Sequence, residues 1–296
     1  LTQYSTEIGQ NKALFDAFEK IQDQPNLDPA QQKIIEHSLR DFRLAGVALS
    51  DDKKARYQAI CERLSTLCTQ FEENIIDATG AWHHHVTDES ELAGLPDYAI
   101  ASAKHAAEQQ SLDGHLFTLH IPSYLAVMQF AENRVLRQSL HHAFSTRASD
   151  QGPTANTFDN SANMQEIMSL RQELAHLLGF EHYAERSLAT KMVDRPQQVL
   201  DFLWQLVDKS QQQARQEYQD LITFAQDELG ITDIEPWDLS FAAEKLKQKK
   251  HAISDNELRP YFPCDKVVSG LFTIVSRLFN VTIKPVEEID SWHNDV

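Results

Sequence analysis

The sequence predicts an all-α protein built from many helices, with one small β-element. Glycine and proline, which interrupt helices, number only 9 and 10 in 296 residues. Through most of the chain apolar residues recur every three or four positions, which places them on one face of an α-helix. One pair of short segments alternates between apolar and polar residues as β-strands do. We therefore expect a multi-helix fold with a hairpin-like excursion near residues 82–121.

The apolar spacing indicates the helices in order along the chain. The strongest signal covers residues 51–79. A second long one covers residues 196–228, which start with a proline and are followed closely by Gly230, the residue types typical of helix ends. Weaker signals predict helices over Ile8–Ile21, Asp28–Ala45, Pro96–Glu108, Tyr124–Phe144, Asn160–Leu178, Leu239–His251 and Asp265–Phe279.

Both long helices carry an apolar face that we expect to be buried against other helices. In residues 51–79 this face consists of Tyr57, Ile60, Leu64, Leu67, Phe71 and Ile75. In residues 196–228 it consists of Val199, Phe202, Leu203, Leu206, Val207, Tyr218 and Leu221. Cys61 and Cys68 lie on or beside the first face, where we expect them to fill core space rather than to carry chemistry.

The predicted β-element and the predicted loop lie between these helices. Trp82–Thr87 and His115–Ile121 alternate as half-buried strands do, and we expect them to form a small hairpin-like element rather than a sheet domain. Residues 149–160 form the loop-rich block of the chain, because Asp150-Gln151-Gly152-Pro153 is a strong turn sequence.

Composition narrows the classes of function. The net charge of −17, from 27 basic and 44 acidic residues, repels nucleic acid and anionic lipid. No apolar run approaches the length of a membrane span, and the first residues lack the features of a signal peptide. The three cysteines are too few for a disulfide framework. We therefore expect a cytoplasmic protein without nucleic-acid or membrane partners.

The thirteen histidines prompt a search for a metal site. The nearest match to the zinc motif His-Glu-x-x-His is Gln172-Glu173-Leu174-Ala175-His176, in which glutamine replaces the first metal-binding histidine. No histidine in the chain is followed by glutamate, so the motif is absent from the sequence. Glu173 and His176 also fit half of a di-iron carboxylate site, but the nearest match to a second half is Asp290 with His293.

The triplet His83-His84-His85 lies on a predicted strand, where neighbouring side chains point to opposite faces. His83 and His85 could therefore face one ion together, although packing in the small β-element is the favoured interpretation. The sequence also lacks a Gly-rich phosphate loop, a Gly-x-Ser-x-Gly turn and a Cys–His signature. The residues alone thus predict a multi-helix protein without a catalytic constellation of its own.

Segments along essentially the whole chain nevertheless resemble the thimet-oligopeptidase-like zinc metallopeptidases. Gln172 and Ala242 depart from the pattern of close relatives, and neither position is a zinc ligand. The segments that carry the resemblance are Leu39-Arg40-Asp41-Phe42, Val86-Thr87-Asp88-Glu89, Glu91-Leu92-Ala93-Gly94, Ile121-Pro122-Ser123-Tyr124, Ser145-Thr146-Arg147-Ala148-Ser149-Asp150-Gln151-Gly152-Pro153, Leu177-Leu178-Gly179-Phe180, Leu188-Ala189-Thr190-Lys191-Met192, Pro236-Trp237-Asp238, Ile253-Ser254-Asp255, Leu258-Arg259-Pro260-Tyr261-Phe262-Pro263 and Trp292-His293-Asn294-Asp295-Val296.

The resemblance implies an all-helical shell in two lobes around a deep channel, with zinc held near its floor by His-Glu-x-x-His and a downstream glutamate. It implies that the whole protein hydrolyses short peptides in this channel, where zinc polarises the scissile carbonyl and activates water. In that family the zinc ligands follow the Trp-His-x-Asp-Val segment. Residues 1–150 would then be a helical N-terminal lobe segment with the β-element, and residues 151–296 a helical segment leading into an absent zinc domain. An N-terminal section would also be missing.

On this interpretation the chain supplies channel wall and substrate-access surface, and its partners are short peptides and the missing catalytic part of its own protein. No catalytic, cofactor-binding or metal-binding residue carries over from the family, so the chain alone is expected to be inactive and to bind no zinc. The candidates for substrate contact are Arg147, Asp150, Gln151 and Gly152. Two alternatives stay open: a non-catalytic helical binding module derived from the family, and an unrelated helix-bundle metal carrier with ligands from His83, His85, Glu173 or His176.

Overall fold

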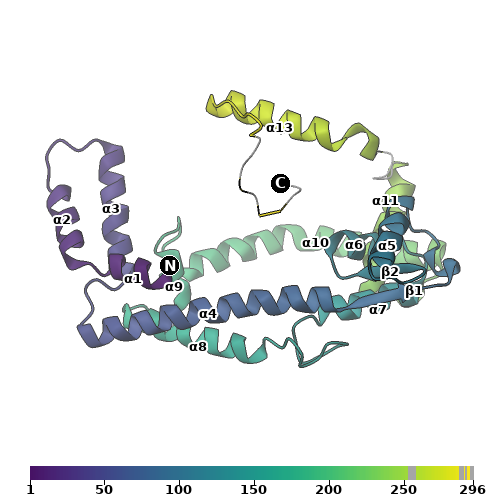
Figure 1. Cartoon of the computed structure of the whole chain (residues 1–296), viewed down its shortest axis with the longest axis horizontal. Helices are drawn as coiled ribbons and strands as arrows, with labels where there is room; N and C mark the ends of the chain where they lie inside the picture. Colours follow the sequence, from purple (N-terminus) through teal and green to yellow (C-terminus); the bar gives the residue numbers. More distant parts are fainter. Residues whose placement is uncertain (253–257, 287–289, 291, 294–296) are drawn as a thin grey trace. The chain divides into compact units, whose positions relative to one another are not determined.

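The computed structural model of the chain describes residues 1–252, 258–286, 290 and 292–293 (Figure 1). The chain divides into two compact units, Leu1–Ala242 and Ala243–Val296. The prediction of a mostly α-helical fold is confirmed, because the described residues form many helices and a single sheet of two strands. Residues 253–255 and 294–296, which contribute to the family resemblance, lie outside the described residues.

The bounds of most elements agree with the predicted ranges to within a few residues, whereas most of α1 and all of α9 lie where no helix is predicted. The second unit contains the 3-10 helix η2 (Arg259–Tyr261) and α13 (Cys264–Phe279). The first unit contains α1 (Thr2–Gly9), α2 (Lys12–Gln22), α3 (Pro29–Leu44), α4 (Asp51–Ala81), β1 (His83–Val86), the 3-10 helix η1 (Glu89–Leu92), α5 (Asp97–Gln109), β2 (His115–Thr118), α6 (Ile121–Phe130), α7 (Arg134–Ser145), α8 (Ser161–Leu177), α9 (Tyr183–Leu188), α10 (Pro196–Leu229) and the start of α11 (Pro236–His251).

Two of the predicted helices are each divided in two, and an asparagine causes both divisions. The predicted helix 8–21 becomes α1 and α2, because the Asn11 side chain accepts a hydrogen bond from the Leu14 N–H at 3.0 Å. The predicted helix 124–144 becomes α6 and α7, because Asn133 accepts from the N–H groups of Val135 and Leu136. A side chain that satisfies the first N–H groups of a helix starts a new helix at that point. The prediction of continuous helices was wrong at both places.

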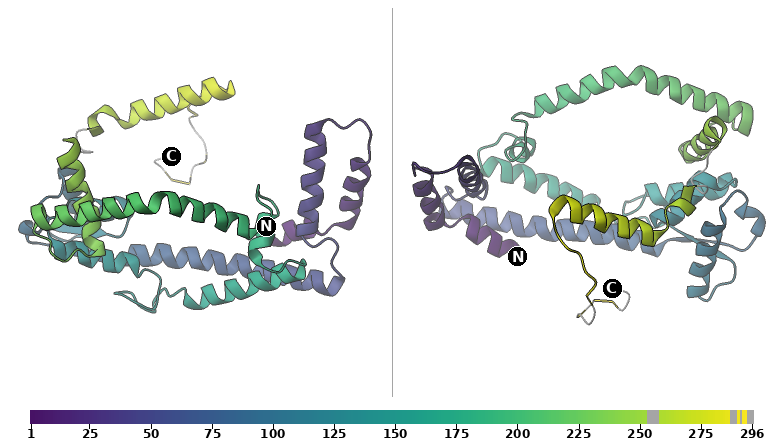
Figure 2. Two further views of the ribbon diagram at one scale, coloured as in Figure 1. Left: turned by 180° about the vertical axis from the view of Figure 1, so that it is seen from behind. Right: turned by 90° about the horizontal axis from the view of Figure 1, so that it is seen from above.

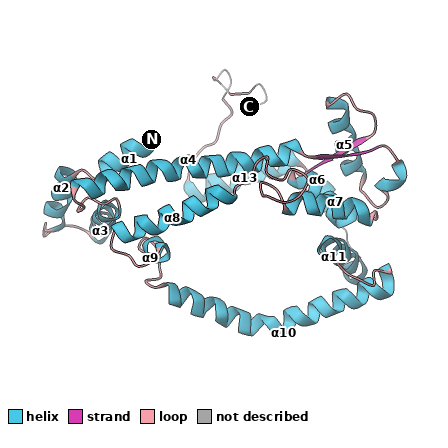
Figure 3. Ribbon diagram, turned by 90° about the horizontal axis from the view of Figure 1, so that it is seen from below, coloured by secondary structure: helices cyan, strands magenta, loops and turns pink. Residues whose placement is uncertain are grey.

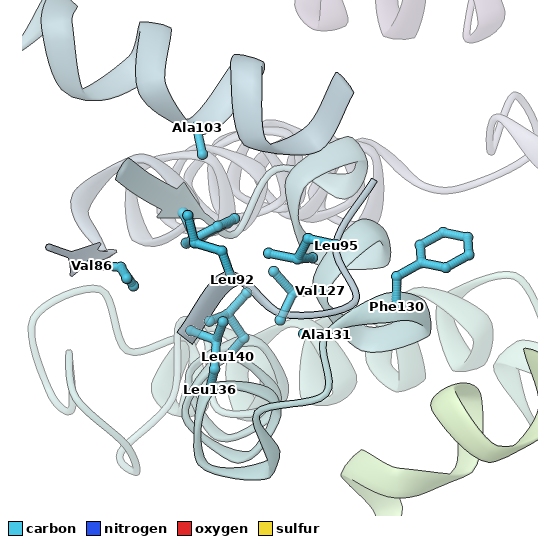
Figure 4. Close-up of a cluster of buried hydrophobic side chains, with 10 residues drawn as sticks. Val86, Leu92, Leu95, Ala103, Val127, Phe130, Ala131, Leu136 and Leu140 are labelled. Atoms are coloured by element: carbon cyan, nitrogen blue, oxygen red, sulfur yellow. The ribbon is translucent and has the colours of Figure 1, made fainter. Parts of the chain in front are cut away.

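The β-element packs into a small core with the helices that follow it. β1 and β2 pair antiparallel, with His83 opposite Thr118 and Val86 opposite His115. Because α5 separates the strands in the chain, they form a paired ribbon rather than a tight hairpin. Figure 4 shows the core beneath them, to which β1, η1, α5, α6 and α7 contribute apolar side chains. Its buried residues are Val86, Leu92, Leu95, Ala103, Phe117, Val127, Phe130, Ala131, Leu136 and Leu140.

Helices α4 and α8 pack along one another and bury half of the predicted apolar face of α4, while its other residues are half-buried. Tyr57, Ile60 and Leu67 are buried against α8 residues, and Cys61 and Cys68 pack beside them as expected. Two bidentate ion pairs flank the contact, Arg56 with Glu173 and Arg63 with Glu166, each with a shortest N–O distance of 2.6 Å. Because these pairs are partly exposed, they orient the helices more than they stabilise them, at roughly 0–1 kcal/mol each.

Helix α10 forms as predicted, but its apolar face is not buried, which corrects the sequence expectation. Phe202 and Leu203 are 59% and 49% exposed, and Ala225 is the buried residue of this helix. Figures 2 and 3 show why: within the first unit α10 runs from α9 to α11 apart from α4 and α8. Gly230 ends the helix in the left-handed conformation, as its position predicted.

The second unit has a similar unpartnered face. Along α13 the side chains of Val267, Leu271, Ile274 and Leu278 are exposed, although they share one side of the helix at three- and four-residue spacing. No helix in the described part of the chain has the length and apolar character needed to cross a membrane.

Candidate functional site

The loop between α7 and α8 contains the four residues predicted to contact substrate, and its first end is fixed by an aromatic stack. Arg147 donates from Nη1 to Thr79 Oγ1 of α4 at 3.2 Å. Its guanidinium lies 3.6 Å from the centre of the Phe144 ring. Phe144 stacks in turn on Tyr124 of α6, with the ring centres 3.9 Å apart. Two segments that carry the family resemblance, around Tyr124 and around Arg147, therefore meet at this stack.

The electrostatic state of Arg147 is unusual for a surface arginine. Its Nε is buried and has no hydrogen-bond partner in the described part of the chain. Burial lowers the pKa of Arg147, although a guanidinium stays protonated throughout the physiological range. A partly desolvated cation with unused donor capacity favours contact with an acceptor such as a carboxylate or a peptide carbonyl.

The second end of the loop is fixed by Asn160, which is 2% exposed. Its Nδ2 donates to the Phe71 carbonyl of α4 at 3.0 Å, and its Oδ1 accepts from Asn74 at 2.8 Å and from Asn163 at 2.9 Å. The Asn160 backbone N–H donates to the Ala148 carbonyl at 3.0 Å, which closes the loop on itself. Both ends are thus attached to α4.

The turn inside the loop is built as its sequence predicted. Gly152 has φ +81°, and a Cβ at this position would lie 1.9 Å from Thr146 Oγ1, so a side chain cannot fit without a shift. Ser149 Oγ donates to the Thr146 carbonyl at 2.8 Å and accepts from the Gln151 N–H at 3.1 Å. The role of Gly152 is therefore to shape the turn.

Asp150 and Gln151 are exposed at the tip of this turn. A carboxylate and an amide on a loop with fixed ends can accept and donate hydrogen bonds to the backbone or the amino group of a peptide. The four predicted residues therefore divide into two exposed polar side chains, one partly buried cation and one turn glycine. This set contains no nucleophile paired with a base.

The residues that most resemble a zinc motif have structural partners. Glu173 forms the bidentate ion pair with Arg56. Gln172 Nε2 lies 2.7 Å from His176 Nε2 and donates to the Glu181 carbonyl at 2.8 Å. This hydrogen bond connects α8 to the segment before α9. Glu173 and His176 therefore both have protein partners in the described part of the chain.

The histidine triplet does not assemble a metal site either. His83 and His85 are exposed on one face of β1, and His85 Nε2 lies 2.5 Å from the Asp113 carbonyl oxygen. His84 points to the other face, where burial lowers its pKa and Ser139 Oγ lies 3.4 Å from its Nδ1. Among the described residues no group of three or more His, Cys, Asp or Glu side chains is placed to hold a metal ion.

The sequence interpretation missed a buried charge network that holds the start of α11 against α7. Asp238 is fully buried and accepts from Arg137 at 2.7 Å and from Arg134 at 2.7 Å, while Arg137 is 1% exposed. Arg137 also donates to the carbonyls of Ala131 and Trp237. Burial alone would raise the pKa of Asp238, but the two arginines outweigh it and hold that pKa below its usual value. Pro236-Trp237-Asp238 is part of the family resemblance, which was the available signal.

Comparison with known proteins agrees with this resemblance. Residues 127–296 match Peptidase family M3, and residues 1–54 match the Neurolysin/Thimet oligopeptidase N-terminal domain. The chain is 48% identical to Oligopeptidase A of Escherichia coli (strain K12), over 100% of the chain and 44% of that relative, and the values for Oligopeptidase A of Haemophilus influenzae are the same. It is 29% identical to Dipeptidyl carboxypeptidase of Escherichia coli (strain K12), over 100% of the chain and 44% of that relative.

The chain thus spans less than half the length of the curated relatives that it matches. The family match nevertheless covers 127–296, which is more than half of the chain, and the identity extends over all of it. On these grounds the chain belongs to peptidase family M3.

Proposed function

We propose that the chain forms the wall and the substrate-access surface of a zinc-dependent oligopeptidase whose zinc site is built from residues outside the chain. The proposal rests on one observation: the whole chain aligns with Oligopeptidase A of Escherichia coli at 48% identity, but the alignment covers only 44% of that relative. It is supported by the described residues, where no group fits a metal ion and the nearest motif is held in structural contacts.

The exposed apolar faces of α10 and α13 support a covering partner. Trp204 on α10 is 63% exposed and Phe279 on α13 is 70% exposed. An exposed apolar face along a helix marks a surface that another segment or a partner covers. The remaining length of the relatives, more than half of each, is ample to supply the helices that cover these faces. On this proposal the partner is the catalytic part of the same protein.

The loop between α7 and α8 is the proposed point of substrate contact in the described part of the chain. Asp150 and Gln151 would bind the backbone or the amino group of a short peptide, and Arg147 would attract a peptide carbonyl or carboxylate. The substrate class follows from the name of the relatives, which are oligopeptidases. The few cysteines fit a reducing cytoplasm as the place of action.

Peptidase assays on two proteins test the proposal. A quenched fluorescent oligopeptide is incubated with zinc and either the 296-residue chain or the same chain joined to the remaining portion of an M3 peptidase. We expect chelator-sensitive cleavage by the longer protein and none by the chain. Chelator-sensitive cleavage by the chain alone would place the zinc site within it and refute the proposal.

Substitutions in the loop test the contact residues in the active, longer protein. Asp150→Asn and Gln151→Ala should raise KM while leaving the thermal midpoint unchanged, because both side chains are exposed and bind only substrate. Asp23→Asn, an exposed aspartate after α2, is the matched control and should change neither quantity. Unchanged KM in both loop variants contradicts the assignment of the loop, without affecting the assignment of the zinc site.

A further inference from the structure

One pocket of the first unit is lined by residues of the end of α3, the start of α4 and the segment from α9 to Lys191. Its volume is about 380 Å³, and its lining includes Tyr57, Tyr183, Arg186, Ser187 and Lys191. Unlike the apolar grooves that helix packing commonly leaves, it combines two cationic side chains with several hydroxyl groups. Neither the fold nor the proposed peptide contact explains this composition.

The two cations have no carboxylate to neutralise them in the described part of the chain. Arg186 lies over the Tyr183 ring, 5.6 Å from its centre, and its Nε is buried without a hydrogen-bond partner among the described residues. Lys191 donates from Nζ to Ser187 Oγ at 2.8 Å. In a chain of net charge −17, carboxylates are abundant, and both arginines of α4 are paired with one. Two cations that line one pocket without an ion pair of their own therefore favour binding of an anion there.

The neighbouring hydroxyl groups are arranged to assist an anion. Because Ser187 Oγ accepts from Lys191, its own proton is free to be donated into the pocket. Thr190 adds a second hydroxyl to the lining. Burial raises the pKa of Tyr57 to about 12, and its hydroxyl donates to the Leu44 carbonyl at 3.1 Å, so the phenol stays neutral and does not repel an anion.

One acidic residue, Asp41, also lines the pocket, but its charge is already neutralised. Arg40 donates from Nε to Asp41 Oδ1 at 2.9 Å, and its Nη2 lies 2.8 Å from the same oxygen. The local balance inside the pocket is therefore positive, in contrast with the acidic chain around it. Long-range repulsion by that chain weakens anion binding at low salt and is screened near physiological ionic strength.

We propose that this pocket is a binding site for a small oxyanion, with Arg186 and Lys191 as the charged ligands and Ser187 and Thr190 as hydroxyl donors. The shared chemistry is a tetrahedral or planar group of negatively charged oxygens, as in inorganic phosphate or in the carboxylate of a short peptide. The proposal does not rest on the proposed peptidase role, because the pocket and its charges are present in the first unit irrespective of what the whole protein does.

Titration of the full chain with phosphate and, separately, with an acetylated dipeptide tests the proposal. Binding is followed by the backbone amide NMR signals of Ser187 and Lys191, at an ionic strength kept constant with chloride. We expect saturable shifts with at least one of the two ligands. Saturation by phosphate alone identifies a phosphate site, and saturation by the dipeptide identifies a carboxylate site.

Charge-matched variants separate this site from general anion effects. Arg186→Gln and Lys191→Gln should each weaken binding at least ~10-fold, because each removes a charge-assisted hydrogen bond. Lys33→Gln removes the same charge at an exposed position of α3 and should leave the affinity unchanged. Lys191 is exposed, so its variant keeps the test valid if Arg186→Gln fails to fold. The absence of saturable binding by either ligand, or an equal loss in all three variants, overturns the proposal.

Discussion

Removing the charge of Asp238 should destabilise the first unit more than most single changes in this chain. Asp238→Asn preserves the shape of the side chain but leaves the fully buried Arg137 without its anion. The asparagine also cannot accept from Arg134, Arg137 and the Glu235 N–H as a carboxylate does. Breaking a buried pair by removal of one partner costs about 3–5 kcal/mol, chiefly because the remaining charge is uncompensated.

Urea denaturation measures this cost, followed by tryptophan fluorescence, to which Trp237 beside Asp238 contributes. Glu166→Gln is the control, since it breaks a bidentate pair with Arg63 whose side chains are 41% and 48% exposed, and its expected cost is at most about 1 kcal/mol. Replacing Arg137 and Asp238 together by Met and Leu should recover much of the loss, because no uncompensated charge then remains between them.

The stabilisation by Asp238 also has a defined pH dependence. Its folded-state pKa lies below its unfolded value of about 3.9. Its contribution is therefore fully present above the unfolded pKa and is lost as the pH falls through the folded pKa. The difference between wild type and Asp238→Asn should be constant from pH 7 to about pH 5 and should shrink below about pH 4. A loss no larger than that of Glu166→Gln at pH 7 would refute the reasoning.

Three further outcomes are expected. Gly152→Ala should destabilise the chain more than Gly179→Ala in urea denaturation: both glycines have positive φ, which costs alanine about 1 kcal/mol, but only at Gly152 does the new Cβ meet Thr146. Equal losses contradict the clash. We expect the chain to self-associate through the exposed apolar face of α10, and Phe202→Glu on that face should lower the mass measured by light scattering; an unchanged mass contradicts a role for that face. Zinc should leave the thermal midpoint of the chain unchanged, because the described residues present no ligand group; a stabilising shift with one bound ion contradicts this.

The sequence predicted the helices well because each depends on local spacing, and it failed where one polar side chain decides the outcome. Asn11 and Asn133 are ordinary residues within apolar patterns, yet each caps a new helix and divides the predicted one. A cap depends on whether the asparagine has extended backbone angles, and the spacing of apolar residues does not report this. The turn at Gly152 was predictable, since turn chemistry is local as well.

The candidate site was predictable only in part, for a related reason. The resemblance identified the loop that contains Arg147, but not the hydrogen bond to Thr79 that holds it, because Thr79 lies 68 positions away in the chain. The pairing of Arg137 with Asp238 was equally invisible, since the two residues are separated by 101 positions. The spacing of residues along the chain predicts which side chains share one face of a helix. It does not predict an ion pair between two helices, because that pair depends on how the helices pack.

The apolar faces of α4 and α10 show what an amphipathic pattern does and does not establish. Both helices carry the same three- and four-residue spacing, and the sequence predicts burial for both. The face of α4 is buried by α8, whereas the face of the 34-residue α10 is exposed. The pattern thus reports that a partner is needed and says nothing about which segment supplies it. On the function proposed above, the exposed face of α10 is the surface on which the catalytic part of the same protein packs.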